Sequence, residues 1–90
     1  MEGEQGKKRI LVAEDNEKSR KLYRRVLEER GFEVLEAEEG SQAWNLALAE
    51  PMDAAIIDIY LPLVDGIELA RRINQEKRTA NIPILMVSAD

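Results

Sequence analysis

The sequence predicts an α/β fold in which short parallel strands alternate with helices in a doubly wound sheet. Three observations support this prediction. Short apolar segments recur along the chain, at 10–13, 32–37, 54–57 and 84–87. Each pair of neighbouring segments is separated by a stretch with apolar residues at helical spacing. Acids or a hydroxyl directly follow three of the apolar segments, where strands would end. Strands that alternate with helices imply parallel pairing through right-handed crossovers.

The first strand is predicted at Ile10–Ala13 and the first helix at Glu17–Arg30. Asn16 precedes the helix and can cap it with its side-chain oxygen. Gly31 follows the helix and suits the left-handed position after a helix end. Apolar residues four apart predict a single inward stripe on this helix. The stripe consists of Leu22, Tyr23, Val26 and Leu27.

The second strand is predicted at Phe32–Ala37, where partial alternation is typical of a strand near the edge of a sheet. A second helix begins at Gly40–Ser41 and ends before Pro51, because proline disfavours helical geometry in the residue that precedes it. The apolar face of this helix consists of Ala43, Trp44, Leu46, Ala47 and Leu48.

The third strand, Ala54–Ile57, is a continuous apolar segment, which favours burial on both faces as in a parallel sheet. Asp65 and Glu68 are spaced like a capping box, so a third helix begins there. The residues expected to face inward are Ile67, Ala70 and Ile73, and those expected to face outward are Arg71, Arg72 and Lys77. Pro83 precedes the fourth strand, Ile84–Val87, at a position where a missing N–H is tolerated.

Composition narrows the classes of function. The chain has 90 residues, enough for one domain, and it contains no cysteine and no histidine. Disulfides, thiolate metal sites and histidine ligands are therefore excluded, and a bound metal should be a hard cation held by oxygen. The net charge is −5 and the pI is near 4.8, which argues against non-specific binding to nucleic acids or anionic membranes. No apolar segment is long enough to span a membrane, and none after residues 1–9 is long enough for a secretory signal, so we expect a cytoplasmic protein.

Polar side chains follow three of the predicted strands. Glu14 and Asp15 follow the first, Asp58 the third and Ser88 the fourth. The carboxyl ends of parallel strands share one edge of the sheet, which is where ligands bind in open α/β sheets. Clustered carboxylates repel one another unless a cation lies among them, and Mg²⁺ prefers oxygen ligands. The pattern indicates phosphoryl chemistry, in which Asp58 is the nucleophile and Ser88 donates a hydrogen bond to a phosphoryl oxygen.

Each of these residues also has a simpler structural explanation. Glu14 and Asp15 could be acids favoured by a helix N-terminus, Asp58 could merely begin a solvated turn, and Ser88 could be a hydroxyl without a role. Packing explains the side chains of Tyr60 and Trp44, and a solvated helix face explains the Arg71–Arg72 pair. The functional interpretation gains weight because polar ends follow three separate apolar segments.

From Lys8 to its end, the chain resembles the receiver domain of bacterial two-component response regulators. The motifs that carry the resemblance are the acidic pair Glu14–Asp15, Asp58, Pro62, Asp65–Gly66, and Ser88 followed by Ala89. The resemblance implies a flavodoxin-like sheet of order 2-1-3-4-5. It also implies that Asp58 takes a phosphoryl group from a sensor histidine kinase or phosphotransfer protein and that Mg²⁺ is required.

The resemblance also implies roles for individual residues. Asp58 would be the phosphoacceptor, and Ser88 would be the switch hydroxyl that follows the phosphoryl group. The metal ligands would be Glu14, Asp15, Asp58 and the backbone carbonyl of Tyr60. Such a module is not an enzyme beyond its own phosphorylation from a donor and slow self-dephosphorylation.

The chain departs from the family pattern in its length. We expect a mobile leader at 1–7 and a partial receiver domain at 8–90 that lacks the last helix-strand-helix. A lysine that pairs with the phosphoryl group belongs to the missing part, so phosphorylation could be impaired. The strand 84–87 would then be an exposed apolar edge, which favours homo-oligomers through edge pairing or exchange of elements.

There are three alternatives to phosphoacceptance. The strongest is an interaction or oligomerisation module of receiver ancestry that is not phosphorylated. A phosphatase with an aspartyl nucleophile is less favoured, because Tyr60 stands where such enzymes of the haloacid dehalogenase type carry a second acid. A nicotinamide enzyme is disfavoured because no Gly-rich loop follows the first strand.

Overall fold

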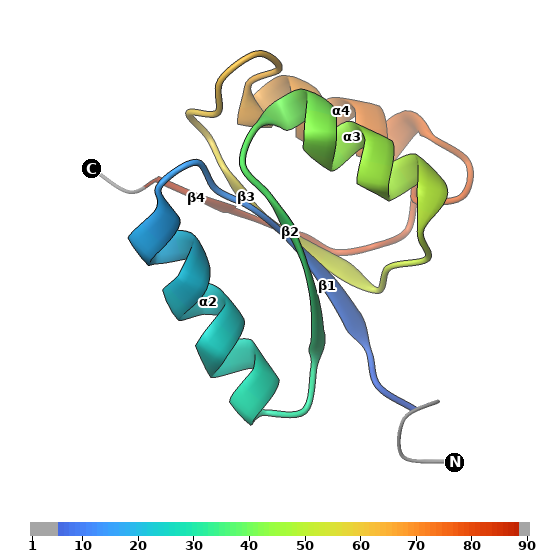
Figure 1. Ribbon diagram of the computed structural model, residues 1–90. Helices are drawn as coiled ribbons and strands as arrows, with labels where there is room; N and C mark the ends of the chain where they lie inside the picture. The colour runs from blue at the N-terminus through green and yellow to red at the C-terminus, as the bar shows by residue number, and fades with distance from the viewer. Residues whose placement is uncertain (1–5, 89–90) are drawn as a thin grey trace.

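A computed structural model describes residues 6–88, and its four strands form one parallel sheet of order β2-β1-β3-β4 (Figure 1). The elements, in chain order, are β1 (Arg9–Ala13), α2 (Glu17–Glu29), β2 (Glu33–Ala37), α3 (Gly40–Ala49), β3 (Ala54–Asp58), α4 (Gly66–Gln75) and β4 (Ile84–Val87). The predicted fold class and strand order are confirmed. Most of the predicted mobile leader, residues 1–5, lies outside the described residues.

Helices cover both faces of the sheet, with α2 on one side and α3 and α4 on the other (Figure 1). Successive residues of β1 therefore enter two different cores. Ile10 and Val12 pack with the α2 side, whereas Leu11 and Ala13 belong to the larger core beneath α3 and α4. In β3, Ile57 is fully buried on the α3–α4 side. The sheet is thus sandwiched, as a doubly wound fold requires.

The predicted caps of two helices are present. The Asn16 side chain accepts a hydrogen bond from the Ser19 N–H at 2.9 Å, and Asp65 accepts one from the Glu68 N–H at 2.9 Å. The Glu68 carboxylate turns to arginines of α4 rather than back to Asp65, so only half of the expected capping box forms. Gly31 follows α2 with a φ of 92°, in the left-handed region expected there.

The single inward stripe predicted for α2 is wrong. Tyr23 and Leu27 pack against the core, but Leu22 is 52% exposed and Val26 is 43% exposed. Adjacent helical positions differ by about 100° around the axis, so a helix lying on β1 and β2 cannot bury both pairs. The described part of the chain contains nothing that covers the second pair.

The predicted inward position of Ile67 in α4 is also wrong, because this side chain is 63% exposed. Leu69 and Ile73, four residues apart, are the fully buried pair of this helix. Residues two apart lie on nearly opposite sides of a helix, so burial of Leu69 turns Ile67 toward solvent.

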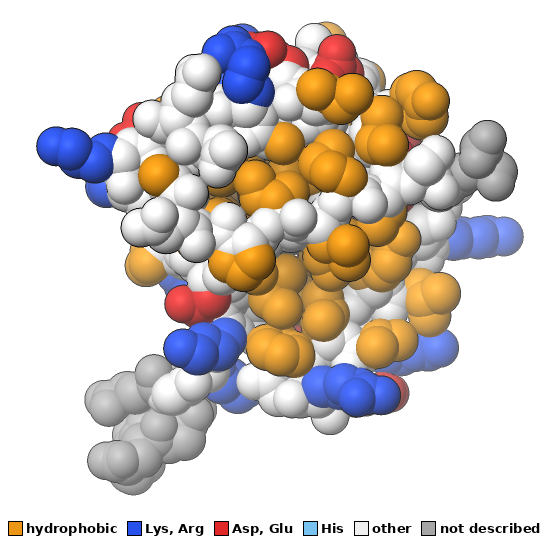
Figure 2. All heavy atoms as spheres, turned by 180° about the vertical axis from the view of Figure 1, so that it is seen from behind, with side chains coloured by type: hydrophobic (Ala, Val, Ile, Leu, Met, Phe, Trp, Pro, Cys, Tyr) orange, Lys and Arg blue, Asp and Glu red, His pale blue; other side chains and the backbone are white. Residues whose placement is uncertain are grey.

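Hydrophobic side chains gather in a broad patch on the back of the molecule, where β4 forms an edge of the sheet (Figure 2). Leu85 of β4 is 59% exposed, and within residues 6–88 only β3 pairs with this strand. Edges of this kind favour pairing with another chain. Self-association through β4 stays a prediction.

The amino edge of the sheet holds a cluster of ion pairs around Arg9. Its guanidinium contacts Glu33 at 3.2 Å and Glu50 at 3.1 Å, and its backbone N–H donates to Asp53 Oδ2 at 2.8 Å. These contacts join the first strand to the second strand, to the end of α3 and to the start of β3.

Among the helices of residues 6–88, none combines the length and the apolar character that a membrane span requires.

Candidate metal centre

Three carboxylates meet at the carboxyl edge of the sheet. Glu14 and Asp15 directly follow β1, and Asp58 is the last residue of β3. These strands are paired in register, with Ala13 opposite Ile57, so Glu14 and Asp58 lie side by side. One carboxylate oxygen from each of the three acids lies within 4.8 Å of the others. The predicted convergence of these residues is therefore observed.

Two of the three acids are buried. Glu14 is 1% exposed and Asp58 is 4% exposed, whereas Asp15 is exposed. Glu14 Oε2 accepts a hydrogen bond from the Asn16 N–H at 3.0 Å, and Asp58 Oδ1 accepts one from the Tyr60 N–H at 3.1 Å. Glu14 Oε1 is buried and has no hydrogen-bond partner. A buried carboxylate oxygen without a partner is costly, which points to a ligand at this position.

The electrostatics of Glu14 favour a cation. Burial raises the pKa of the Glu14 carboxyl, the Asn16 N–H opposes that rise, and the charges of Asp58 and Asp15 add to it. A divalent cation would offset the repulsion among the three carboxylates and would give Glu14 Oε1 the partner that it lacks. An all-oxygen donor set suits a hard cation such as Mg²⁺. The residues present therefore fit the metal that the family resemblance implied.

The acids line a hollow of about 620 Å³. The residues around it are Glu14, Asp15, Asn16, Glu17, Ser19, Asp58 and Tyr60. Tyr60 lines this hollow, and the role of its backbone carbonyl as a metal ligand stays a prediction. Ser88 directly follows β4, which lies beside β3, but it is exposed and is not among the residues that line the hollow. Its role as a switch hydroxyl also stays a prediction.

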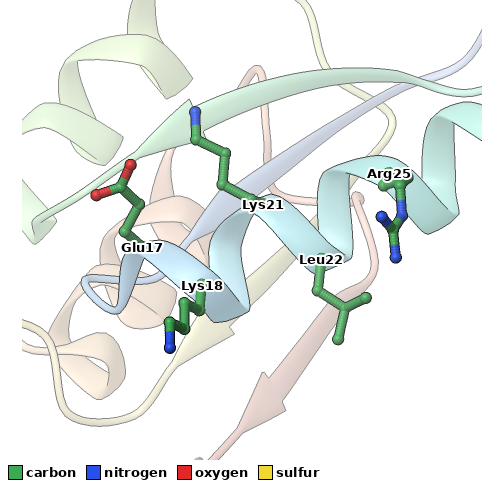
Figure 3. A pocket seen from close by; sticks show the side chains of 5 residues that line it. All are labelled: Glu17, Lys18, Lys21, Leu22 and Arg25. Atoms are coloured by element: carbon green, nitrogen blue, oxygen red, sulfur yellow. The ribbon is translucent and has the colours of Figure 1, made fainter.

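A second hollow, of about 670 Å³, lies along α2 and shares Glu17 with the first (Figure 3). Lys18, Leu22 and Arg25 extend from one side of the helix there, and Lys21 extends from another (Figure 3). This groove combines positive charge with an exposed apolar side chain directly beside the acidic hollow.

The sequence interpretation missed Arg20. This arginine is 6% exposed, and its Nη1 donates to the Glu14 backbone carbonyl at 3.0 Å. A signal was available, because Arg20 lies three and seven residues before Tyr23 and Leu27, on the buried side of α2. A charged residue in line with core positions indicates a buried partner.

A parallel sheet with helices on both faces and an acidic cluster at its carboxyl edge defines the class of doubly wound α/β domains, which bind ligands at this edge. Residues 10–90 match the family model of the response regulator receiver domain, and the chain belongs to this family. It covers the N-terminal part of such a domain.

Curated relatives agree with this assignment. The chain is 38% identical to the response regulator GtcR of Aneurinibacillus migulanus over 82 residues, which is 91% of this chain and 33% of GtcR. It is 33% identical over 82 residues to the polar-differentiation response regulator DivK of Brucella ovis, covering 91% of this chain and 67% of DivK. The chain thus spans about a third of the length of GtcR and two thirds of that of DivK.

Solved structures of receiver domains superpose well. One is the receiver domain of the sensor histidine kinase PA1611 from Pseudomonas aeruginosa, which has a magnesium ion coordinated in its active-site cleft. It matches with a TM-score of 0.88 at 28% identity, and the match covers 94% of this chain and 70% of the PA1611 chain. The response regulator TrrA from Thermotoga maritima, in complex with Mg²⁺ and BeF, matches with a TM-score of 0.85 at 34% identity, covering 92% and 70%.

Proposed function

We propose that this chain accepts a phosphoryl group on Asp58 in two-component signalling, with Mg²⁺ bound by Glu14, Asp15 and Asp58. The observation that carries this proposal is the approach of three carboxylates to within 4.8 Å at the carboxyl edge, with a buried, unpartnered Glu14 oxygen among them. Membership of the receiver family and the magnesium in the PA1611 receiver domain support it.

Asp58 is the nucleophile in this proposal. The Tyr60 N–H holds Asp58 Oδ1, which orients the carboxylate at the end of a rigid strand. An Asp58 oxygen forms a new bond to phosphorus while the bond between phosphorus and the donor breaks, and the donor leaves with the bonding electron pair. When bound, Mg²⁺ offsets negative charge on the phosphoryl group and keeps the carboxylates together.

Other residues serve the site from its rim. The backbone carbonyl of Tyr60 is proposed as a further metal ligand. The Ser88 hydroxyl, at the end of the neighbouring strand, is proposed to donate a hydrogen bond to a phosphoryl oxygen after transfer. Its place supports this proposal, because Ser88 directly follows Val87, the residue that is paired with Asp58 in the sheet.

The phosphodonor is proposed to be a sensor histidine kinase or a phosphotransfer protein, acting in the cytoplasm. The groove along α2 supports a protein donor, because Lys18, Lys21 and Leu22 offer charge and apolar contact there (Figure 3). Glu17 lines both this groove and the acidic hollow, so the two adjoin. Receiver domains are signalling modules, so the proposed product is a phosphorylated state of the chain itself.

The test is incorporation of phosphate from acetyl phosphate and Mg²⁺, followed by intact-protein mass spectrometry. We expect the native chain to gain one phosphoryl group and the Asp58→Asn variant to gain none, with its circular dichroism spectrum unchanged. Asp53→Asn is the matched control, because Asp53 lies at the opposite end of the same strand and is not in the acidic cluster. Incorporation into Asp58→Asn would show that another residue is the acceptor.

A second candidate function is an interaction or oligomerisation module that is not phosphorylated. The hydrophobic patch around β4, with Leu85 59% exposed, favours it (Figure 2). Sedimentation of the 90-residue chain tests it: we expect self-association that Leu85→Lys weakens, since a charge on an edge strand opposes pairing. A compact monomer at high concentration, together with phosphate on Asp58, would contradict this second function.

A further inference from the structure

Arg20 of α2 is the most buried cation in the described part of the chain and lies directly behind the acidic site. Its Nη1 donates to the Glu14 backbone carbonyl at 3.0 Å, and its Nε donates to Glu36 Oε1 at 2.9 Å. One planar guanidinium therefore joins three segments: the loop after β1, the helix α2 and the end of β2. The proposed catalytic step uses neither Arg20 nor Glu36.

The backbone of Glu14 is held by hydrogen bonds at both its N–H and its carbonyl. Its N–H donates to the Ala37 carbonyl at 3.0 Å, and its carbonyl accepts from Arg20. With both backbone groups held, the Cα–Cβ bond from which the Glu14 side chain extends toward Asp58 is held in direction as well. Asp15 follows in the same loop, so its backbone position depends on the same anchor.

Glu36 is well suited to hold the guanidinium in place. Its carboxylate contacts Arg20 at 2.9 Å, Lys21 at 3.9 Å and also Arg24. Burial alone would raise the pKa of Glu36, but the hydrogen bonds from Arg24 and Arg20 outweigh it and lower that pKa. Glu36 therefore stays ionised, and Arg20 is both neutralised and oriented where a lone buried charge would be unfavourable.

We propose that Arg20, anchored by Glu36, is a positioning residue that sets the geometry of the metal ligands Glu14 and Asp15, and with it the preference of the site for Mg²⁺ over Ca²⁺. This inference rests on the proposed metal site. Mg²⁺ requires near-ideal octahedral geometry, whereas Ca²⁺ accepts variable geometry, so a rigid ligand loop favours Mg²⁺. Partners that orient metal ligands typically change metal affinity by about 10–100-fold when removed.

The decisive variant is Arg20→Lys, which keeps the positive charge but loses the planar guanidinium with its several N–H donors. An ammonium at the end of a flexible stem cannot reproduce the planar guanidinium that contacts Glu14 and Glu36 together. Because the charge near the acids is unchanged, any loss of affinity reports on position and not on electrostatic attraction. The matched control is Arg24→Lys, which alters a contact to the same Glu36 carboxylate but none to Glu14.

The measurement is calorimetric titration of the 90-residue chain with Mg²⁺ and, separately, with Ca²⁺. We expect Arg20→Lys to raise the Kd for Mg²⁺ about tenfold and to raise the Kd for Ca²⁺ much less, so that the preference for Mg²⁺ falls. Arg24→Lys should leave both constants within about twofold, as expected for an exposed ion pair. A purely structural role would lower thermal stability without changing the ratio of the two constants.

The outcomes separate the two proposals. A native chain that binds no Mg²⁺ would overturn the metal site and this inference with it. A native chain that binds Mg²⁺, with an Arg20→Lys variant of equal affinity and preference, would overturn only the role of Arg20. Equal losses in Arg20→Lys and Arg24→Lys would also overturn it. If circular dichroism shows that Arg20→Lys is unfolded, Glu36→Gln, which removes the ionic anchor of Arg20, should lower the preference for Mg²⁺ in the same direction.

Discussion

Acidic side chains are paired with a cation or a backbone N–H at the amino edge of the sheet, whereas they cluster with one another at its carboxyl edge. At the amino edge, Arg9 contacts Glu33 and Glu50, and its backbone N–H contacts Asp53. At the carboxyl edge, three acids approach to within 4.8 Å of one another, and the nearby buried cation, Arg20, contacts only a backbone carbonyl of this cluster.

The difference separates acids that are paired within the fold from acids that we propose bind a cation. The acids at the amino edge are paired, so they tie strands and a helix together. At the carboxyl edge, burial and mutual repulsion raise the pKa of Glu14, and one of its oxygens has no partner. A buried, unpartnered carboxylate oxygen beside like charges costs stability, and a bound cation would offset that cost. The predictions below test this contrast, beginning with the largest expected effect.

Removing a ligand at the carboxyl edge should weaken metal binding strongly. We expect Asp15→Ala to raise the Kd for Mg²⁺ by at least about tenfold, the lower limit seen for residues that merely support a ligand. The fold should persist, because Asp15 is exposed. Calorimetry measures the effect, and Glu33→Ala at the other edge is the control, expected to bind Mg²⁺ normally. Unchanged affinity in Asp15→Ala would remove this residue from the metal shell.

Removing one negative charge should change stability in opposite directions at the two edges. Without metal, Asp58→Asn should stabilise the fold by on the order of 1 kcal/mol, because like-charge repulsion falls. The matched change Glu33→Gln should lower stability slightly, because Arg9 loses an ion-pair partner. Urea denaturation in the presence of EDTA measures both. The contrast between the edges fails if both variants shift in the same direction.

Glu68, which lies outside both edges of the sheet, is a further example of a paired carboxylate. Hydrogen bonds from Arg71 and Arg72 lower the pKa of Glu68 from 4.5 to about 2. The resulting stabilisation is complete above pH 4.5 and is lost as the pH falls toward about 2. In this range Glu68 of the unfolded chain binds a proton while Glu68 of the folded chain is still ionised, so the unfolded state is favoured as the pH falls.

The Glu68→Gln variant should therefore have a lower melting temperature than the native chain near neutral pH. This difference in melting temperature should disappear as the pH approaches about 2. Because the pairs lie on an exposed helix surface, the shift should be the smallest of the three effects. Thermal melts monitored by circular dichroism across this pH range measure it. A difference that stays constant with pH would show that Glu68 acts through packing and not through its charge.

Local sequence patterns were sufficient for the alternation of strands and helices and for the acids of the site, whereas the strand order was implied by the resemblance to receiver domains. The segments at 10–13, 54–57 and 84–87 are short and apolar enough to indicate buried parallel strands, and the structure pairs them as expected. The carboxyl ends of parallel strands share one edge, and the acids that follow two of these segments converge there because β1 lies beside β3 in the sheet. Asn16, Gly31 and Asp65 marked helix ends through purely local hydrogen bonding and backbone geometry.

Orientation around the helix axes was less predictable. Helical spacing grouped Leu22 with Tyr23 and placed Ile67 inward, but both Leu22 and Ile67 are exposed. Spacing identifies apolar residues that share a side of a helix, and only contact with the sheet decides which side is buried. The Glu39 side chain, which accepts from the Ser41 and Gln42 N–H groups at the start of α3, was missed because glutamate is not a preferred cap.

The sequence alone determined the alternation of strands and helices and the identity of Glu14, Asp15 and Asp58 as acids at strand ends, because these depend on neighbouring residues. The tertiary structure decided the rest: that Glu14 Oε1 is buried without a partner, and that Arg20 reaches across to Glu14 and Glu36. Both facts depend on how α2 lies on the sheet. Contacts between residues distant in the chain are set by packing, which no local pattern encodes.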